Sequence, residues 1–329
     1  MDEIFEKILL NGFGLKLNSS QRIRTCLICS TNGGIVALKK HNCDSLMVEF
    51  ESEARNTLVK NGFENVNRFI LSVEENACYT FSEANYTLEP YVPLSTPDME
   101  SEETVLKAVD ALARMHRASF GLEFDGGRSG IGRLPELFKK RISELRHIRK
   151  DIARRGQYDI MDMVIKNNYK YFYDRAQRAL LKLTESGYHK LSAEAGLKKS
   201  FCHNSFKSGN FMLNQLEEIF VDSMAKCAYD IPVLDVAYFI RRMMKEPDFD
   251  ERYARKILYT YQSRMEFGQR ECSVVEAMLL FPWKFMSLCN EYYNKRRNYC
   301  LEPASERFIR CIEASPKEER ILDFLDKYV

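Results

Sequence analysis

The amino-acid sequence predicts an α+β protein, with a small strand-rich part at the N-terminus and a large, mainly helical part after it. Two observations carry this prediction. An Asn-Gly step at residues 32–33 joins two strand-like runs, which is a strong hairpin signal. After Pro90, apolar residues change from strand-like to helical spacing. We therefore expect an N-terminal lobe over residues 1–88, a hinge over residues 89–94 and a helical lobe over residues 95–329.

Composition excludes several classes of partner. The chain has 329 residues and a formal net charge of +2, so it has no strong field that would attract nucleic acid or an anionic membrane. Residues 1–9 carry three acids and no long apolar run, unlike a secretory signal. No window approaches about 18 uninterrupted apolar residues, so no membrane span is expected. These features predict a soluble, intracellular protein.

The ten cysteines show no disulfide framework, and we expect reduced, packed thiols. Cys26 and Cys29 form the one close pair, but on a strand they point to opposite faces. A zinc site also needs a second pair, which the sequence lacks. Metal binding by these cysteines is therefore not expected.

In the N-terminal lobe, we expect a short sheet, and its second strand ends in Ile35–Lys39. Such a strand either presents its lysine to the phosphates of a nucleotide or is an edge strand whose Lys39 is solvated. In the helix that follows, Glu51 lies two turns before Leu58 and shares its inward face, whereas the alternative is a helix of solvated acids. The expected elements are helix 1–18, strands 23–30 and 34–39, helix 45–60, and strands 68–73 and 77–81.

In the helical lobe, Ser101 with two following glutamates begins a helix that places His116 on an apolar stripe. We interpret His116 as a core histidine with satisfied hydrogen bonds, and Gly126–Gly132 as a loop. The helix 134–155 is strongly basic, and this face is either solvated or a docking surface for an acidic partner. Further helices are expected over residues 169–183, 233–245, 252–266, 272–297 and 304–312, and from Ser315-Pro316 to the C-terminus.

The segment 201–224 predicts a polar loop followed by a β-hairpin. Its spacing of His203 and Asn210 is that of the catalytic loop of kinase-like phosphotransferases. In the intact motif an aspartate accepts the proton of the acceptor hydroxyl, and the asparagine binds magnesium. Here Ser205 stands at the aspartate position, and a hydroxyl has no basicity near neutral pH.

Over nearly its whole length, the chain resembles the aminoglycoside phosphotransferase/choline kinase branch of the protein-kinase-like fold. Within that branch it is similar to the bacterial spore-coat CotS-type family. The resemblance implies a bilobal fold, with one helix beside the N-terminal sheet and an ATP cleft between the lobes. The resemblance rests on five segments: Ile35–Lys39, Leu112–His116, Cys202–Asn210, Tyr229–Val236 and Phe281–Trp283.

The resemblance also implies roles for residues of the cleft. Lys39 would bind phosphates, with Glu51 or Glu53 steadying it. The hinge Leu88–Tyr91, with Glu89 and Tyr91, would bind the nucleotide. The remaining implied positions belong to the loop: His203 and Ser205 at the catalytic positions, and Asn210 at the magnesium position.

A second departure concerns the metal-binding aspartate of related proteins, about thirteen residues after the loop asparagine. Counting without gaps places Ser223 there, and the nearest acid, Asp222, is one residue away. On a strand, a shift of one residue turns a side chain to the opposite face unless a bulge restores its direction. Two expected carboxylates are thus replaced by serine, and binding of ATP and magnesium should be weak or absent.

The sequence therefore predicts a pseudokinase with a structural or docking role in spore coat assembly. The alternative is an active small-molecule kinase that phosphorylates a hydroxyl group, with Asp222 or Asp230 displaced into the metal role. A third possibility is a protein that binds nucleotide as a structural ligand or switch. By resemblance, its partners are other spore coat proteins, and it moves from the cytoplasm of the mother cell to the spore coat.

Overall fold

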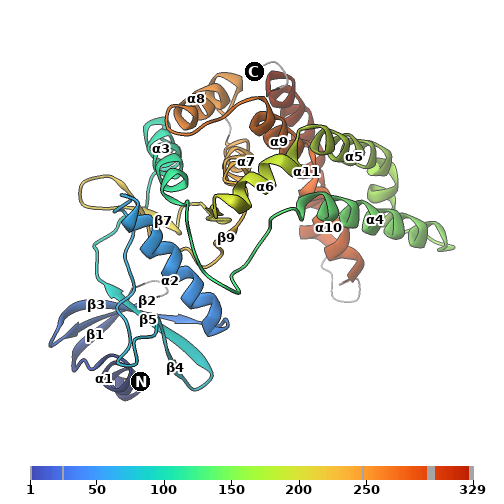
Figure 1. The fold of residues 1–329 in the computed structure, drawn as a ribbon. Helices are drawn as coiled ribbons and strands as arrows, with labels where there is room; N and C mark the ends of the chain where they lie inside the picture. The colour runs from blue at the N-terminus through green and yellow to red at the C-terminus, as the bar shows by residue number, and fades with distance from the viewer. Residues whose placement is uncertain (1, 24–25, 247, 295–300, 326–329) are drawn as a thin grey trace. The chain divides into compact units, whose positions relative to one another are not determined.

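The computed structural model describes residues 2–23, 26–246, 248–294 and 301–325, and they divide into two compact units. The first unit comprises Met1–Ser129, Ala195–Asp235 and Thr260–Met265. The second comprises Gly130–Glu194, Val236–Tyr259 and Glu266–Val329. The predicted α+β class is confirmed, because an antiparallel sheet near the N-terminus is followed by a mainly helical remainder (Figure 1). The boundaries predicted for lobes and hinge remain predictions.

The first unit contains a five-stranded antiparallel sheet in the order β1-β2-β3-β5-β4. Its strands are β1 (Leu17–Ile23), β2 (Cys26–Thr31), β3 (Gly34–His41), β4 (Tyr79–Phe81) and β5 (Ala84–Pro90). The sequence assigns the first two residues of β1 to the helix over residues 1–18 and only its last residue, Ile23, to a strand. The preceding helix α1 (Asp2–Phe13) ends early, because Gly14 adopts a φ of 67° that favours glycine.

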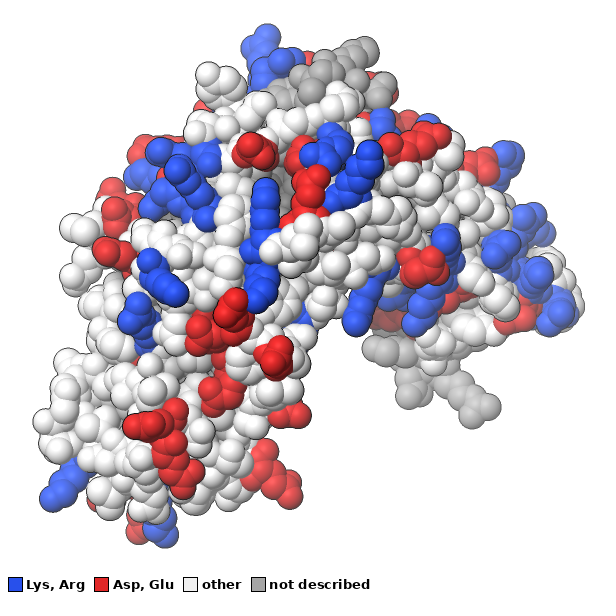
Figure 2. All heavy atoms as spheres, in the orientation of Figure 1, with Lys and Arg blue, Asp and Glu red and all other residues white. Residues whose placement is uncertain are grey.

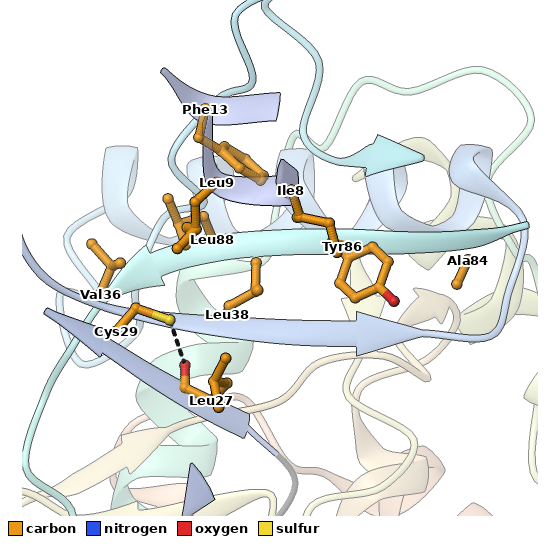
Figure 3. Close-up of a cluster of buried hydrophobic side chains, with 10 residues drawn as sticks. All are labelled: Ile8, Leu9, Phe13, Leu27, Cys29, Val36, Leu38, Ala84, Tyr86 and Leu88. Carbon is orange, nitrogen blue, oxygen red and sulfur yellow. Dashed lines mark hydrogen bonds between the residues drawn. The ribbon is translucent and has the colours of Figure 1, made fainter. Parts of the chain in front are cut away.

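Alternation along the strands gives the sheet two different faces. Leu38 lies opposite Leu27 on β2 and Leu88 on β5, and these leucines pack with Ile8 and Leu9 of α1 (Figure 3). The intervening residues point to the other face, where Ile28, Ala37 and Glu89 lie in register. Helix α1 therefore covers one apolar face, and the opposite face is left for the polar groups described below.

Helix α2 (Ser45–Lys60) has the bounds predicted from the sequence, and the Asp44 carboxylate caps it by accepting the N–H of Leu46. The Asn61 side chain donates to the carbonyls of Ala118 and Phe120, at the end of helix α3 (Glu102–Ala118). The predicted strand at residues 68–73 is wrong, since only an isolated bridge joins Ile70 to Leu88. A turn closed by Ser72 and Asn76 replaces it.

The loop and hairpin after residue 200 also belong to the first unit. Strand β6 (Phe201–Cys202) pairs with β9 (Ala228–Tyr229). The hairpin predicted beyond the loop is present as β7 (Phe211–Leu213) and β8 (Ile219–Val221). Asn214 shapes its turn, because its side-chain oxygen accepts the N–H groups of Leu216 and Glu218.

The second unit is helical, and α5 packs against α4 and α9 at its centre. Stacked rings fill this core, with Phe172 lying 3.9 Å from Phe285 and Phe138 lying 3.9 Å from Phe281 between centroids. The helices of this unit are α4 (Leu134–Ala153), α5 (Ile160–Glu185), α9 (Gln269–Leu280), α10 (Trp283–Asn294) and α11 (Leu301–Leu325). Three others, α6 (Tyr188–Leu197), α7 (Val233–Met243) and α8 (Glu251–Gln262), have ends in both units.

Two of the helices expected near the C-terminus differ from the structure. The single helix predicted over 272–297 is broken at Pro282, which ends α9 and begins α10; its last residues, 295–297, lie outside the described part. The helix predicted to begin at Ser315 is instead part of α11, and the Ser315 hydroxyl donates to the carbonyl of Cys311 as inside a helix. Its predicted end, at residues 326–329, is also outside the described residues.

Within the described ranges, one stretch, Gln269–Asn294, is long and apolar enough to cross a bilayer by length and composition alone. However, 78% of its apolar window is buried inside the protein. The stretch comprises α9 and α10, on either side of Pro282. Core packing therefore accounts for its apolar character.

Candidate active site

A cavity of about 160 Å³ opens on the face of the sheet away from α1. Ile28 and Ala37 from the sheet and Met212 from the hairpin provide apolar walls. Lys39, Glu89 and Asp222 bring three charged side chains to the same cavity. The other lining residues are Ile23, Cys26, Asn67, Pro90, Tyr91, Val92 and Leu94.

The strand end beside this cavity, residues 90–93, exposes few backbone hydrogen-bonding groups. Pro90 and Pro93 have no N–H, and the N–H of Tyr91 donates to Ile35. The Pro90 carbonyl accepts the side chain of Asn67. In the part of the chain that the structure describes, the Val92 N–H is left as the one uncommitted backbone donor of these four residues.

Lys39 is held by two carboxylates. Its ammonium forms an ion pair with Glu89, and it donates to the Asp222 side chain at 2.8 Å and to the Asp222 carbonyl at 3.1 Å. Burial favours the neutral amine, but Glu89 and Asp222 outweigh it, and the pKa of Lys39 is raised. Lys39 is therefore charged and fixed in the cavity wall, and the predicted site residues Lys39, Glu89 and Asp222 lie together.

The predicted pair between Lys39 and a glutamate of α2 is not formed. Glu51 is buried, but its carboxylate accepts two hydrogen bonds from Arg55, at 2.7 and 3.1 Å, and one from the backbone of Met224. Despite burial, Arg55 and these donors lower the pKa of Glu51. The alternative, Glu53, lies half-buried beside Asn56 instead.

Sequence reasoning missed Arg55. Its guanidinium is 1% exposed and also lies 3.4 Å from Glu89, while donating to the carbonyls of Asn67 and Asp222. The available signal was its position four residues after Glu51, where helical side chains meet. Arg55 thus takes the carboxylate that was expected to steady Lys39.

The loop at 203–210 is anchored by Asp235, at the start of α7. The Asp235 carboxylate accepts the N–H groups of His203 at 2.6 Å and Asn204 at 2.8 Å, which holds Asn204 at a φ of 59°. It also contacts His116, whose other ring nitrogen contacts the Tyr261 hydroxyl. His116 is therefore a fully buried core histidine with both nitrogens partnered, as predicted.

His203 is fully buried as well, and its Nδ1 accepts the N–H of Ser205 at 3.2 Å. Burial lowers its pKa, which keeps the ring neutral. Among the described residues its Nε2 has no hydrogen-bond partner. His203 therefore shapes the loop from within and does not face the cavity lining.

Asn210 and Ser205 are directly connected. The Asn210 amide donates to the Ser205 carbonyl at 2.8 Å and to its hydroxyl at 2.9 Å. This uses the NH₂ group of Asn210, and no described residue donates to its side-chain oxygen. The amide is thus oriented with its oxygen available to another ligand.

Two residues, Asp222 and Ser223, lie opposite the single residue Asn210, and this arrangement brings Asp222 into the cavity lining. The N–H groups of both Asp222 and Ser223 donate to the carbonyl of Asn210, at 2.9 and 3.1 Å. This is the pattern of a β-bulge directly after β8. Asp222 then contacts Lys39, whereas Ser223, at the position reached by counting, is not part of the cavity lining.

The family described as "Spore coat putative kinase YutH" matches residues 6–325. The chain belongs to this family. The match covers both units, so the loop, the sheet and the helical remainder all lie within the family region. The resemblance to a spore-coat family inferred from the sequence is therefore confirmed.

Solved structures of phosphotransferases share the fold. An aminoglycoside phosphotransferase from Alicyclobacillus acidocaldarius has a TM-score of 0.80 at 15% identity, covering 95% of this chain and 92% of that chain. A microcompartment-associated aminopropanol kinase has a TM-score of 0.61 at 12% identity, covering 99% and 98%. A spectinomycin phosphotransferase in complex with ADP and spectinomycin has a TM-score of 0.58 at 13% identity, covering 97% and 98%. This level of identity establishes the kinase-like fold and leaves the activity open.

Proposed function

We propose that this member of the spore-coat family is a pseudokinase that binds a magnesium nucleotide and acts as a docking component of the coat. The observation that carries the proposal is the chemistry of the loop at residues 203–210. It contains no aspartate or glutamate, and Ser205 stands where the proton acceptor is needed. The cavity beside it nevertheless keeps the groups that a nucleotide requires.

The fit of the cavity to a nucleotide rests on its three kinds of wall. Apolar side chains suit the faces of a base, and the Val92 N–H suits a hydrogen-bond acceptor on its edge. Lys39 offers a positive charge for phosphate. The Asp222 carboxylate of the lining is an oxygen ligand that Mg²⁺ prefers. Asn210 is outside the lining, but its carbonyl accepts the Asp222 N–H, and its side-chain oxygen is a second ligand of the same kind. Bound magnesium would neutralise phosphate charge.

The site lacks a general base for phosphoryl transfer. The Ser205 hydroxyl accepts a hydrogen bond from Asn210 and is not a base at neutral pH. A positioned general base contributes roughly 10²- to 10⁴-fold in rate, which is about 3 to 5 kcal/mol. His203 does not substitute for it, since its unpaired nitrogen is buried. We therefore expect binding without appreciable turnover.

A second candidate function is an active small-molecule kinase that phosphorylates a hydroxyl group. The contact between Asp222 and Lys39 favours it, because an acid in this place is available to a metal ion. Such an enzyme would transfer phosphate slowly, without a loop carboxylate. The printed names of structural neighbours, such as aminopropanol kinase, point to the same chemical class.

The docking role is supported by the charge of the second unit. Residues 133–170 carry eleven Lys and Arg against five Asp and Glu, although the whole chain has a net charge of only +2. Figure 2 shows Lys and Arg gathered over the C-terminal end of α4. Lys139, Arg146, Lys150 and Arg154 repeat at spacings of seven, four and four residues; we call these four residues the basic stripe.

Exposed apolar groups lie next in sequence to the basic stripe. Tyr158, Ile160 and Met163 are 40%, 71% and 42% exposed near the start of α5. Cations beside apolar groups fit an acidic polypeptide that also buries apolar side chains. Other coat proteins are the proposed partners. The description of the family supports a place in the spore coat, and a route there from the mother-cell cytoplasm is part of the proposal.

Calorimetry with Mg-ATP, together with a turnover assay over a panel of hydroxyl acceptors, tests the proposal. We expect saturable binding that Lys39→Ala weakens at least tenfold, and no acceptor-dependent release of ADP. Turnover that depends on an acceptor would favour the kinase instead. Absence of Mg-ATP binding by the folded protein would leave only a docking role.

A further inference from the structure

The ammonium group of Lys39 is surrounded by oxygens of two acidic residues. Two of its three N–H donors go to the carboxylate and the carbonyl of Asp222, and the ammonium also forms an ion pair with Glu89, whose Oε1 has no hydrogen-bond partner among the described residues. A phosphate that approaches Lys39 therefore competes with these oxygens. Which one leaves determines what kind of ligand the cavity accepts.

The charges around Lys39 do not balance. Lys39 and Arg55 face three carboxylates, those of Glu51, Glu89 and Asp222. Glu51 and Glu89 are each 2% exposed, so water screens them poorly. Without a ligand, this group of five side chains has one negative charge in excess, which opposes the approach of an anionic phosphate chain.

The two acids that hold Lys39 differ in their other contacts. Asp222 has a side chain that is 30% exposed and lies beside Asn210, whose carbonyl accepts its N–H. Its carboxylate could pass from Lys39 to a divalent cation. Glu89 cannot follow it, because it is buried and also paired with Arg55 at 3.4 Å. Among the described residues, the cations that pair with Glu89 are Lys39 and Arg55.

We propose that Glu89 makes the cavity selective for metal-bound nucleotide over free nucleotide. A ligand that carries its own divalent cation draws Asp222 away from Lys39 and offsets the excess negative charge. A free nucleotide brings more negative charge and leaves both acids on Lys39. Glu89 is thus a specificity-determining residue, and this inference rests on the proposed binding of nucleotide.

Glu89→Gln tests this inference with little risk to folding. It leaves two cations and two carboxylates, in the pairs Lys39–Asp222 and Arg55–Glu51, so the charges of the group balance. Glu89→Met is a second variant of similar length that removes the hydrogen-bonding amide. The matched control is Glu53→Gln, which removes a half-buried acid of α2 outside the cavity lining. Thermal unfolding of each variant checks that the protein is folded.

The experiment is calorimetry with ADP, once with Mg²⁺ and once with EDTA. The wild-type protein and Glu53→Gln should bind Mg-ADP at least tenfold more tightly than ADP in EDTA. In Glu89→Gln and Glu89→Met, the affinity for ADP in EDTA should rise about tenfold, with a smaller change for Mg-ADP. In these two variants, the ratio of the affinity for Mg-ADP to the affinity for ADP in EDTA should therefore be smaller than in the wild-type protein.

The outcomes separate this inference from the proposed function. If folded Glu89 variants keep the wild-type ratio, Glu89 does not set selectivity, although nucleotide binding stands. If neither the wild-type protein nor the variants bind ADP in either condition, nucleotide binding itself fails, and the inference fails with it. If only the variants bind, Glu89 excludes nucleotide with and without metal, which overturns both the selectivity inferred here and the proposed binding.

Discussion

The imidazole of His116 lies 3.1 Å from the carboxylate of Asp235, and both side chains are almost fully buried. The two residues are 119 positions apart, on α3 and α7. The same carboxylate accepts the N–H groups of His203 and Asn204. One aspartate therefore joins a core helix to the loop that carries Ser205, which explains how the loop keeps its conformation without a catalytic acid.

Asp235→Asn should destabilise the first unit. An asparagine has one acceptor oxygen where two oxygens now accept backbone N–H groups, so one buried donor would face an NH₂ group. We expect a loss of about 3 kcal/mol in the free energy of unfolding, measured by urea titration. Asp98→Asn, at an exposed position, is the control. Equal urea midpoints for Asp235→Asn and Asp98→Asn would show that the hydrogen bonds accepted by Asp235 contribute nothing to stability.

Ser205→Asp should create a proton acceptor at the loop position of the motif. The Asn210 amide, which now donates to Ser205, would be able to donate to the new carboxylate. If the rest of the site is competent, turnover of ATP with a hydroxyl acceptor should rise by about 10²-fold or more. Ser208→Asp, in the same loop, is the matched control. A rise in the control alone, or in both alike, would contradict the assignment of Ser205.

Asp230 should make stability fall as the pH rises. Burial raises its pKa to about 6, whereas an unfolded aspartate has a pKa of about 3.9. Between these values the folded state binds more protons than the unfolded state, so the free energy of unfolding decreases from about pH 4 through about pH 6. Asp230→Asn keeps an oxygen for the Ile231 N–H and should flatten this decrease.

Urea titrations at several pH values between 4 and 7 measure the effect of Asp230→Asn as the difference from the wild-type protein. Asp125→Asn, at an exposed position, should keep the wild-type slope. A difference that stays constant with pH would mean that Asp230 does not titrate in this range.

Reversing three charges of the basic stripe should abolish docking to an acidic partner. Arg146, Lys150 and Arg154 are exposed, and changing all three to Glu turns an attractive surface into a repulsive one. We expect retention on a polyglutamate matrix at low salt to fall at least tenfold. Lys7, Lys60 and Arg68 are also exposed, and changing them to Glu alters net charge equally. Equal losses in both triple variants would show that only net charge matters.

Much of the fold follows from local patterns in the sequence. The Asn-Gly hairpin and helix α2 are where the apolar spacing and turn residues put them. Strand β1 escapes this reasoning because it is an edge strand, and most of its side chains are exposed without apolar alternation. The helix break at Pro282 could have been predicted from the sequence, since proline removes a helical hydrogen bond.

The site could be predicted only in part. The family resemblance points to Lys39, Glu89 and Asn210. In the structure Lys39 contacts both Glu89 and Asp222, and the Asp222 N–H donates to Asn210. The partner of Glu51 could not be found by matching a motif, because Arg55 competes for it from one helical turn away. Which carboxylate pairs with which cation depends on packing between elements far apart in sequence.

The shared carbonyl of Asn210 has a consequence for how proteins of this kind are found. At the β-bulge, two residues lie opposite the single residue Asn210. A change of one residue in chain length between β7 and Asp222 therefore need not turn the Asp222 side chain away from the cavity. A search pattern that demands a fixed interval from asparagine to aspartate would discard such a chain, even though its acid reaches the lysine. Counts of degenerate kinases based on fixed intervals would then include proteins whose carboxylate still contacts this lysine.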